Sequence, residues 1–236
     1  MLKNSYIISN FENLDKMVRS RLKSKAQVIH ILVVTLKVIL TDLNPVDTGI
    51  GSFAIRDKGS TRRMYFTIQD EENKVLKHFS IIFPFNISIK GEQTYFFLNN
   101  REIVIDLYVL EILSTLCKNK WFSDLNEDNH DIVDFIYMYD DLLREFNISK
   151  EMESDLWSVI KFLMTFEPCY IRYDYDLINE KEDHPLHHVD VNYSDIGTFK
   201  LGFNESIQIL ERLKLDEFED ILLNGKSRLE NCYKLT

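Results

Sequence analysis

The residue types best suited to chemistry gather between Cys169 and Phe203, where three of the six histidines lie. Three short segments there alternate with period two, which is the periodicity of a β-strand. In the second segment Val189 and Val191 form an apolar side, and their neighbours form a polar side. If the segments pair as an antiparallel sheet, one face carries a polar set: Arg172, Asp174, Asp176, His188, Asp190, Asn192 and Lys200.

Two interpretations of this polar set remain open. It is either the solvated outer face of an antiparallel sheet, or a site in which a histidine and carboxylates bind a metal or transfer a proton. The spacing matches no standard zinc motif, so the identity of any metal is left unknown. The predicted catalytic residues are His188, Asp190, Asp174 and Asp176, and the predicted binding residues are Arg172, His184, Asn192 and Lys200.

The adjacent histidines His187 and His188 receive different predictions. Pro185 pushes the residue before it toward extended geometry, so the strand is expected to begin after it. His187 then points to the apolar side with Val189, where a histidine is usually buried and hydrogen-bonded. His188 faces the polar side and is the better candidate for function.

The same stretch carries a resemblance. Arg172-Tyr-Asp-Tyr-Asp176, followed by His184-Pro185-x-x-His188 and a closing apolar strand, resembles a signature of an uncharacterised bacterial family, a domain of unknown function. Members of that family are encoded near phage-defence and mobile-element genes. The resemblance covers about the last third of the chain. It implies a biological setting rather than a reaction.

Composition sets broad limits on fold and partners. The 236 residues are 45% hydrophobic and 28% charged, which suits one large globular domain or two small ones. The net charge of −10 argues against broad, nonspecific binding to nucleic acid. Three widely spaced cysteines are typical of reduced thiols, so we expect a cytoplasmic protein.

The periodicity of the whole chain predicts an α+β fold. We expect a long N-terminal helix over about residues 11–42, whose apolar run of about 13 residues is too short to span a membrane. An antiparallel β-meander follows over residues 50–99. A helical middle (101–117, 131–146, 150–166), a small C-terminal antiparallel sheet and two terminal helices (205–213, 215–223) complete the chain. We divide it into an N-terminal lobe, residues 1–99, and a helical lobe with the small sheet, residues 100–236.

The chemistry motifs leave open whether the protein is an enzyme. The sequence has no phosphate-binding glycine loop, no G-x-S-x-G elbow and no His-Glu-x-x-His helix. A restriction-type nuclease core would need an acid-x-Lys strand, and Asp190-Val-Asn192 lacks the lysine.

Three functions therefore compete. We favour a noncatalytic interaction or regulatory subunit of a bacterial anti-phage defence assembly. It would have protein subunits as partners, through which nucleic acid could also bind, and it would need no membrane and no cofactor. The alternatives are a metal-dependent nuclease or phosphodiesterase that uses a divalent metal at His188 and Asp190, and an antitoxin-like protein that binds a basic partner.

Overall fold

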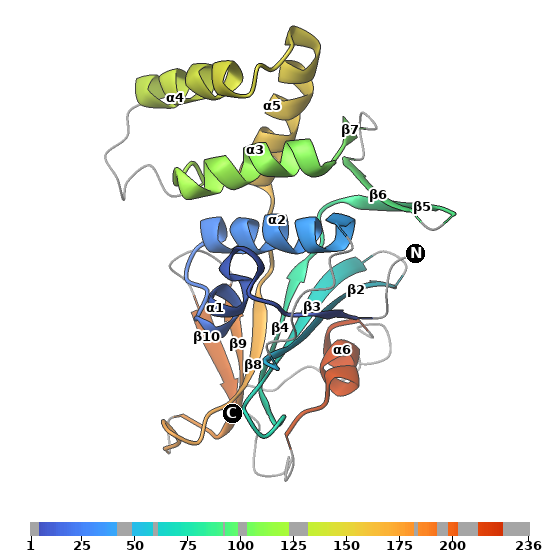
Figure 1. Ribbon diagram of the computed structural model, residues 1–236. Coiled ribbons are helices and arrows are strands. Elements are labelled where there is room, and N and C mark those ends of the chain that lie inside the picture. The colour runs from blue at the N-terminus through green and yellow to red at the C-terminus, as the bar shows by residue number, and fades with distance from the viewer. Residues whose placement is uncertain are drawn as a thin grey trace. The chain divides into compact units, whose positions relative to one another are not determined.

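The computed structural model describes residues 5–41, 49–58, 61–91, 93–98, 103–122, 132–181, 184–192, 198–202 and 212–223 (Figure 1). Contacts within the chain define two compact units. The helical unit comprises Met1–Lys3, Ser9–Val46 and Pro84–Pro168, and the sheet unit comprises Asn4–Ile8, Asp47–Phe83 and Cys169–Thr236. This grouping differs from the expected division into residues 1–99 and 100–236, because the chain leaves the sheet unit at Phe83 and returns to it at Cys169.

The sheet unit is built on one seven-stranded antiparallel sheet. The C-terminal strands are antiparallel, as expected, and they extend the N-terminal meander through the pairing of Phe79 with Arg172. The helix α6 (Leu215–Leu223) belongs to the same unit. In spatial order the strands are β1 (Tyr6–Ile7), β2 (Gly51–Lys58), β3 (Thr61–Gln69), β4 (Val75–Ile82), β8 (Ile171–Tyr175), β9 (His187–Asn192) and β10 (Thr198–Gly202).

A row of side chains crosses one face of this sheet. Tyr6, Phe53, Phe66 and Phe79 lie on successive strands in directly paired positions. Their rings stack with centroid separations of 5.2, 5.7 and 4.3 Å. Such cross-strand pairs are the unit of sheet stabilisation. The position paired with Phe79 is Arg172, so the row changes from aromatic to charged between β4 and β8.

The helical unit contains most of the helices and a second, three-stranded sheet. The side chain of Asp106 accepts a hydrogen bond from the Val109 N–H and caps one helix, and Ser149 caps another in the same way. The helices are η1 (Phe11–Asn13), α1 (Leu14–Arg19), α2 (Lys25–Thr41), α3 (Leu107–Lys118), α4 (Ile132–Glu145) and α5 (Lys150–Thr165), and the strands are β5 (Asn86–Lys90), β6 (Gln93–Leu98) and β7 (Ile103–Val104).

The prediction of one long N-terminal helix is wrong. The chain is broken between α1 and α2, where Ser20 adopts an extended backbone conformation. The Ser20 hydroxyl donates to the Lys16 carbonyl, and the Gln27 side chain accepts from the Lys23 N–H. Short polar side chains compete with the backbone in this way and favour helix ends over helix interiors.

A buried lysine stands in the apolar part of α2. The side chain of Lys37 is 1% exposed, and its Nζ lies 2.7 Å from Glu12 Oε1 and 3.0 Å from Glu111 Oε1. A lysine is tolerated inside a protein when it is paired in this way. In the part of the chain that the structure describes, no helix combines the length and the apolar character needed to cross a bilayer.

The α+β prediction is confirmed, and α3 to α6 lie close to where helices were expected. The meander is divided, however, because β5 and β6 pair with β7 in the separate sheet. Pro84 lies at the division, and proline has no N–H with which to continue a sheet. The helix expected over residues 205–213 falls almost entirely outside the described residues.

We predict that Phe66→Ala lowers the free energy of unfolding by about 3–5 kcal/mol, because a fully buried ring between two others leaves a cavity. Ile178, which is 93% exposed, provides the control: Ile178→Ala should change stability by less than about 0.5 kcal/mol. Urea denaturation of both variants measures this. Equal midpoints would contradict the aromatic row as a source of stability.

Candidate functional site

The pairing of β8 with β9 brings the polar residues together. Arg172 lies directly opposite Asp190, and Asp174 lies directly opposite His188. Side chains at directly paired positions of an antiparallel ladder point to the same face, with Cβ atoms about 4.5–5.5 Å apart. Four of the residues nominated from the sequence therefore form one cluster, which we call the polar cluster: Arg172, Asp174, His188 and Asp190.

The Arg172 guanidinium joins the two carboxylates of the cluster. One of its nitrogens, Nη2, lies 2.5 Å from Asp174 Oδ2 and 2.7 Å from Asp190 Oδ2. Hydrogen bonds between ionised groups are short and strong. The contact fixes the orientation of both carboxylates and neutralises part of their charge.

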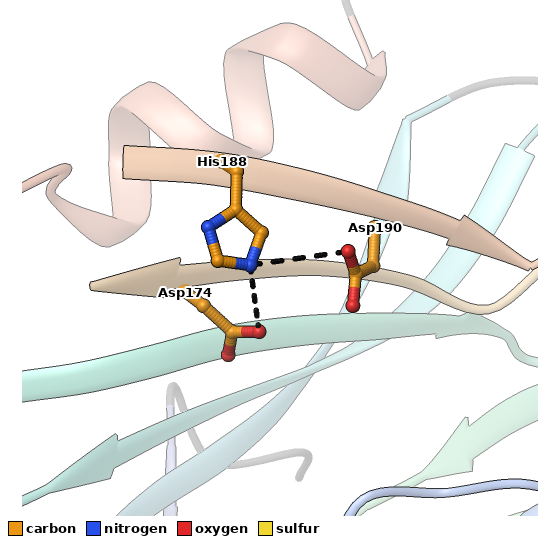
Figure 2. Close-up of side chains that lie close together, drawn as sticks. All are labelled: Asp174, His188 and Asp190. Atoms are coloured by element: carbon orange, nitrogen blue, oxygen red, sulfur yellow. Dashed lines mark ion pairs between the residues drawn. The ribbon is translucent and has the colours of Figure 1, made fainter. Parts of the chain in front are cut away.

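The His188 ring is held by a backbone carbonyl on its other side. Its Nδ1 lies 2.9 Å from the Pro185 oxygen, which can only accept, so Nδ1 carries the proton and donates. Nε2 faces the carboxylates, 3.5 Å from Asp174 Oδ2 and 3.9 Å from Asp190 Oδ1 (Figure 2). Both distances exceed the usual range for a hydrogen bond from nitrogen to oxygen.

Burial contradicts a solvated surface at the centre of this face. The side chains of His188 and Asp190 are each 1% exposed, and that of Arg172 is 9% exposed. Asp174 is more accessible, at 15%. Burial by itself would raise the pKa of Asp174, but His188 and the Arg172 guanidinium together hold that pKa below its usual value. The carboxylate therefore stays ionised at neutral pH.

Lys77 is a member of this face that the sequence did not reveal. It lies on β4 directly opposite Asp174, and it is buried. Burial and the nearby Arg172 guanidinium lower the pKa of Lys77 to about 8, although Asp174 acts in the opposite direction. The one available signal was that Lys77 shares the face of Phe79, where an apolar residue is expected.

Asp176 and His184 form a second pair at the more exposed end of the site. His184 Nε2 lies 3.4 Å from Asp176 Oδ2, and the rings of His184 and His188 have centroids 4.6 Å apart. Burial would raise the pKa of Asp176, but hydrogen bonds from Asn179 and the contact with His184 lower it. These two predicted site residues therefore adjoin the polar cluster without entering it.

The last two predicted site residues lie farther along the strands. Asn192 is half-buried, and its backbone N–H donates to the Tyr170 carbonyl at 3.0 Å. The backbone of Lys200 on β10 lies opposite Asp190, but its side chain is outside the described residues.

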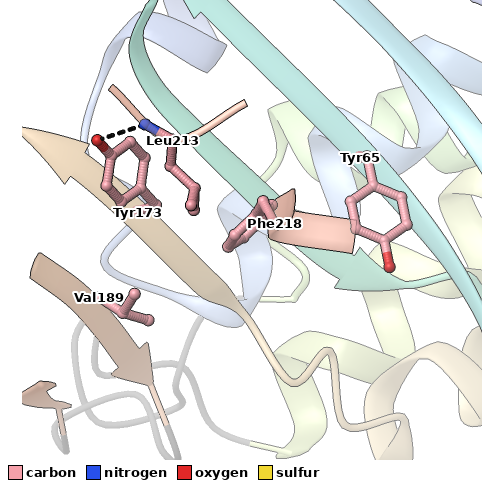
Figure 3. Packing of buried hydrophobic residues seen from close by; sticks show 5 residues of the cluster. All are labelled: Tyr65, Tyr173, Val189, Leu213 and Phe218. Atoms are coloured by element: carbon pink, nitrogen blue, oxygen red, sulfur yellow. Dashed lines mark hydrogen bonds between the residues drawn. The ribbon is translucent and has the colours of Figure 1, made fainter. Parts of the chain in front are cut away.

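The opposite face of β8 and β9 is apolar, as the alternation predicts. Val189 and Tyr173 pack with Leu213, Phe218 and Tyr65 in a buried cluster on which α6 rests (Figure 3). Polar and apolar faces thus share the same two strands, and the packing of α6 supports the backbone that carries the site.

Two histidines, His187 and His78, make their hydrogen bonds on this apolar face and not in the polar cluster. The Tyr173 hydroxyl accepts from the Leu213 N–H at 3.0 Å and forms a hydrogen bond with His187 Nδ1 at 2.8 Å. His78 lies 2.9 Å from the Leu213 carbonyl through Nε2 and 3.0 Å from the Thr67 hydroxyl through Nδ1. The prediction that His187 points to the apolar side and makes a hydrogen bond is confirmed. The backbone of Leu213 is therefore held at both its N–H and its carbonyl.

No protein-family model matches this chain, and neither a curated protein nor a solved structure does.

We predict that Arg172→Met destabilises the fold by about 3–5 kcal/mol, because it leaves two buried carboxylates without their cation. Adding Asp190→Asn to this variant should restore part of the loss, since one uncompensated charge is removed. The control is Arg62→Met, which breaks the more exposed Arg62–Asp57 pair and should cost less than about 1 kcal/mol. Chemical denaturation of the three variants measures the effect, and equal losses for Arg172→Met and Arg62→Met would refute it.

A second prediction concerns acid stability. Burial lowers the pKa of His78 below 6.5, with the Leu213 carbonyl acting against it, so the unfolded chain takes up a proton more readily than the folded one. The contribution of neutral His78 is therefore complete above pH 6.5 and is lost as pH falls, by at most about 1.4 kcal/mol per pH unit. His78→Gln should reduce the loss of stability between pH 7.5 and pH 5 in urea titrations. An unchanged loss would show that His78 does not protonate on unfolding.

Proposed function

We propose that this protein is a noncatalytic interaction subunit of a cytoplasmic multiprotein assembly. The observation that carries the proposal is an apolar groove of about 360 Å³ in the helical unit. Val104 and Leu107 line it and are 51% and 41% exposed. Aromatic side chains line it too: Tyr95 and Tyr108 are 37% and 39% exposed. Exposed apolar and aromatic side chains that gather in one place are typical of protein interfaces.

The occupant that fits this groove is an apolar segment of a partner subunit. The groove lies between the second sheet and the start of α3. Most of its lining side chains are apolar or aromatic, and two, Thr94 and Asp106, are polar. The other lining residues are Leu40, Tyr95, Val104, Ile105, Leu107 and Tyr108. The net charge of −10 also fits a basic partner, as the antitoxin-like alternative requires.

The polar cluster supports the same proposal from the other unit. Its ionised groups are paired with one another, and two of its members, His188 and Asp190, are almost fully buried. Buried and paired groups of this kind stabilise the fold, whereas a catalytic group must be accessible to its substrate. We expect the assembly to be a bacterial anti-phage defence assembly, because the resemblance at Arg172–Asp176 and His184–His188 implies that setting.

We predict that Leu107→Asp reduces co-purification with the protein products of adjacent genes at least tenfold when all are expressed together. Leu107 is the first residue of α3, where an aspartate suits the helix N-terminus, so the fold should be preserved. Ile136→Asp is the control, because Ile136 is 56% exposed on α4 and does not line the groove. A parent chain that purifies alone, or a Leu107→Asp variant that keeps its partners, would overturn the proposal.

A metal-dependent nuclease or phosphodiesterase is the second candidate, and one observation favours it. Asp174, His188 and Asp190 each offer an atom that could bind a metal, within 4.8 Å of one another. The lysine that the sequence pattern lacked stands on β4, where Lys77 faces Asp174. Carboxylates, a histidine and a lysine on one face form a set suited to metal-assisted hydrolysis.

Purified protein mixed with Mn²⁺ or Mg²⁺ and with generic RNA or DNA tests this candidate. Cleavage should be abolished by a chelator and by Asp174→Asn, whereas Asp57→Asn, on the exposed pair of β2, should leave it unchanged. Cleavage that persists in Asp174→Asn would point to a contaminating nuclease and would count against this second function.

A further inference from the structure

The polar cluster contains three metal-ligand atoms at distances that suit a shared ion. His188 Nε2 lies 3.5 Å from Asp174 Oδ2 and 3.9 Å from Asp190 Oδ1. Zinc in proteins binds imidazole nitrogen and carboxylate oxygen at about 2.0–2.2 Å. Two ligands of one tetrahedral ion therefore stand about 3.4 Å apart, and no two ligands exceed about 4.4 Å. The two separations from His188 fall within that reach, and all three ligand atoms lie within 4.8 Å of one another.

The His188 ring is oriented as a metal ligand requires. Nδ1–H donates to the Pro185 carbonyl, so in the neutral ring the nitrogen that faces the carboxylates is the one with the lone pair. A metal-binding histidine almost always donates its second ring nitrogen to a carbonyl or carboxylate in this manner. A loop carbonyl thus fixes the tautomer before any ion binds.

Arg172 Nη2 contacts one oxygen of each carboxylate, and on Asp174 that oxygen, Oδ2, is also the one nearest His188. On Asp190 the same nitrogen contacts Oδ2, while the oxygen nearest His188 is Oδ1. Asp190 can therefore bind Arg172 with one oxygen and an ion with the other. Hydrogen bonds to ligating carboxylates from outside the ligand set are a regular part of metal sites.

A protonated His188 is the rival explanation for the same cluster. An imidazolium would donate to a carboxylate at about 2.7–2.9 Å, as charged nitrogen–oxygen pairs do. The separations of 3.5 and 3.9 Å are longer than that and match the spacing of two ligands of one ion. The geometry therefore favours a cation larger than a proton.

From these contacts we infer that Asp174, His188 and Asp190 bind one divalent transition-metal cation, Zn²⁺ or Mn²⁺. Imidazole and carboxylate together suit these ions better than Ca²⁺ or Mg²⁺, which prefer oxygen alone. The inference goes beyond an interaction subunit, since the ion could stabilise the β8–β9 pair without any reaction. It deepens the metal-dependent nuclease candidate, which requires such an ion.

Metal titration of the full chain tests the site directly. The protein is stripped with a chelator, and Zn²⁺, Mn²⁺ and Co²⁺ are added separately while binding is followed by calorimetry and, for Co²⁺, by visible absorption. We expect one equivalent to bind and to raise the Tm. His188→Gln and Asp174→Asn should each weaken binding at least tenfold. His187→Gln is the matched control, because His187 is the next residue on β9 and points to the opposite face, so its metal affinity should equal that of the parent.

The metal affinity of Lys77→Met distinguishes metal binding from a purely structural role of the cluster, because a structural role predicts no change in affinity. Lys77 lies opposite Asp174, and its ammonium repels a cation bound there. Its replacement should tighten metal binding severalfold, while the substitutions of the ligands weaken it. Asp174 is partly exposed and asparagine has its shape, so Asp174→Asn keeps the test valid if His188→Gln fails to fold.

Three results would overturn the inference: no binding to the parent at millimolar metal, equal loss in His187→Gln and His188→Gln, or unchanged affinity in Asp174→Asn. The first would also remove the nuclease candidate and would leave a protonated His188 as the explanation. It would not affect the interaction proposal, which is tested at Leu107 in the other unit. Metal binding without cleavage of RNA or DNA would support the inference and remove only the nuclease.

Discussion

The contact on which the rest of the site depends is the Arg172 guanidinium between Asp174 and Asp190. Three charges in a largely buried position cost desolvation energy, and only close, well-oriented pairing offsets that cost. The pairing exists because β8 and β9 meet in a register that sets Arg172 opposite Asp190. A shift by one residue would turn the charged side chains toward the apolar cluster and bring Val189 to the charged face. The three charged side chains therefore favour this register of β8 and β9, and only this register brings them into contact.

The two faces of β8 and β9 differ in composition and in what they contact. One face carries the polar cluster, and the other packs on Leu213 and Phe218 beside α6. The Tyr173 hydroxyl and His78 hold the Leu213 peptide from two strands of the same sheet, which ties the segment before α6 to the strands of the site. Apolar packing on the opposite face of β8 and β9 therefore supports the backbone of the site. Its side chains can be held close together because the backbone beneath them is fixed on its other side.

The features that bear on function lie in different units. The apolar groove belongs to the helical unit and the polar cluster to the sheet unit. Each of them has its own physical basis, since the groove rests on exposed apolar area and the cluster on buried charge. A subunit that binds partners through one unit and an ion through the other combines both without requiring catalysis. For this reason a result at one place leaves the proposal for the other intact.

The sequence by itself determined the local features of this protein. Period-two alternation placed His188 and Asp190 on one face and Val189 on the other, and apolar spacing located α3 to α6, because both signals depend on neighbours along the chain. Tertiary structure decided what depends on distant segments. The pairing of β8 with β4 brought Lys77 to Asp174, and burial enclosed the centre of a polar face whose exposure the sequence left open. The break at Ser20 is a local feature that the apolar spacing did not reveal. No local pattern encodes which strands become neighbours, since that choice is made by the burial of apolar surface over the whole fold.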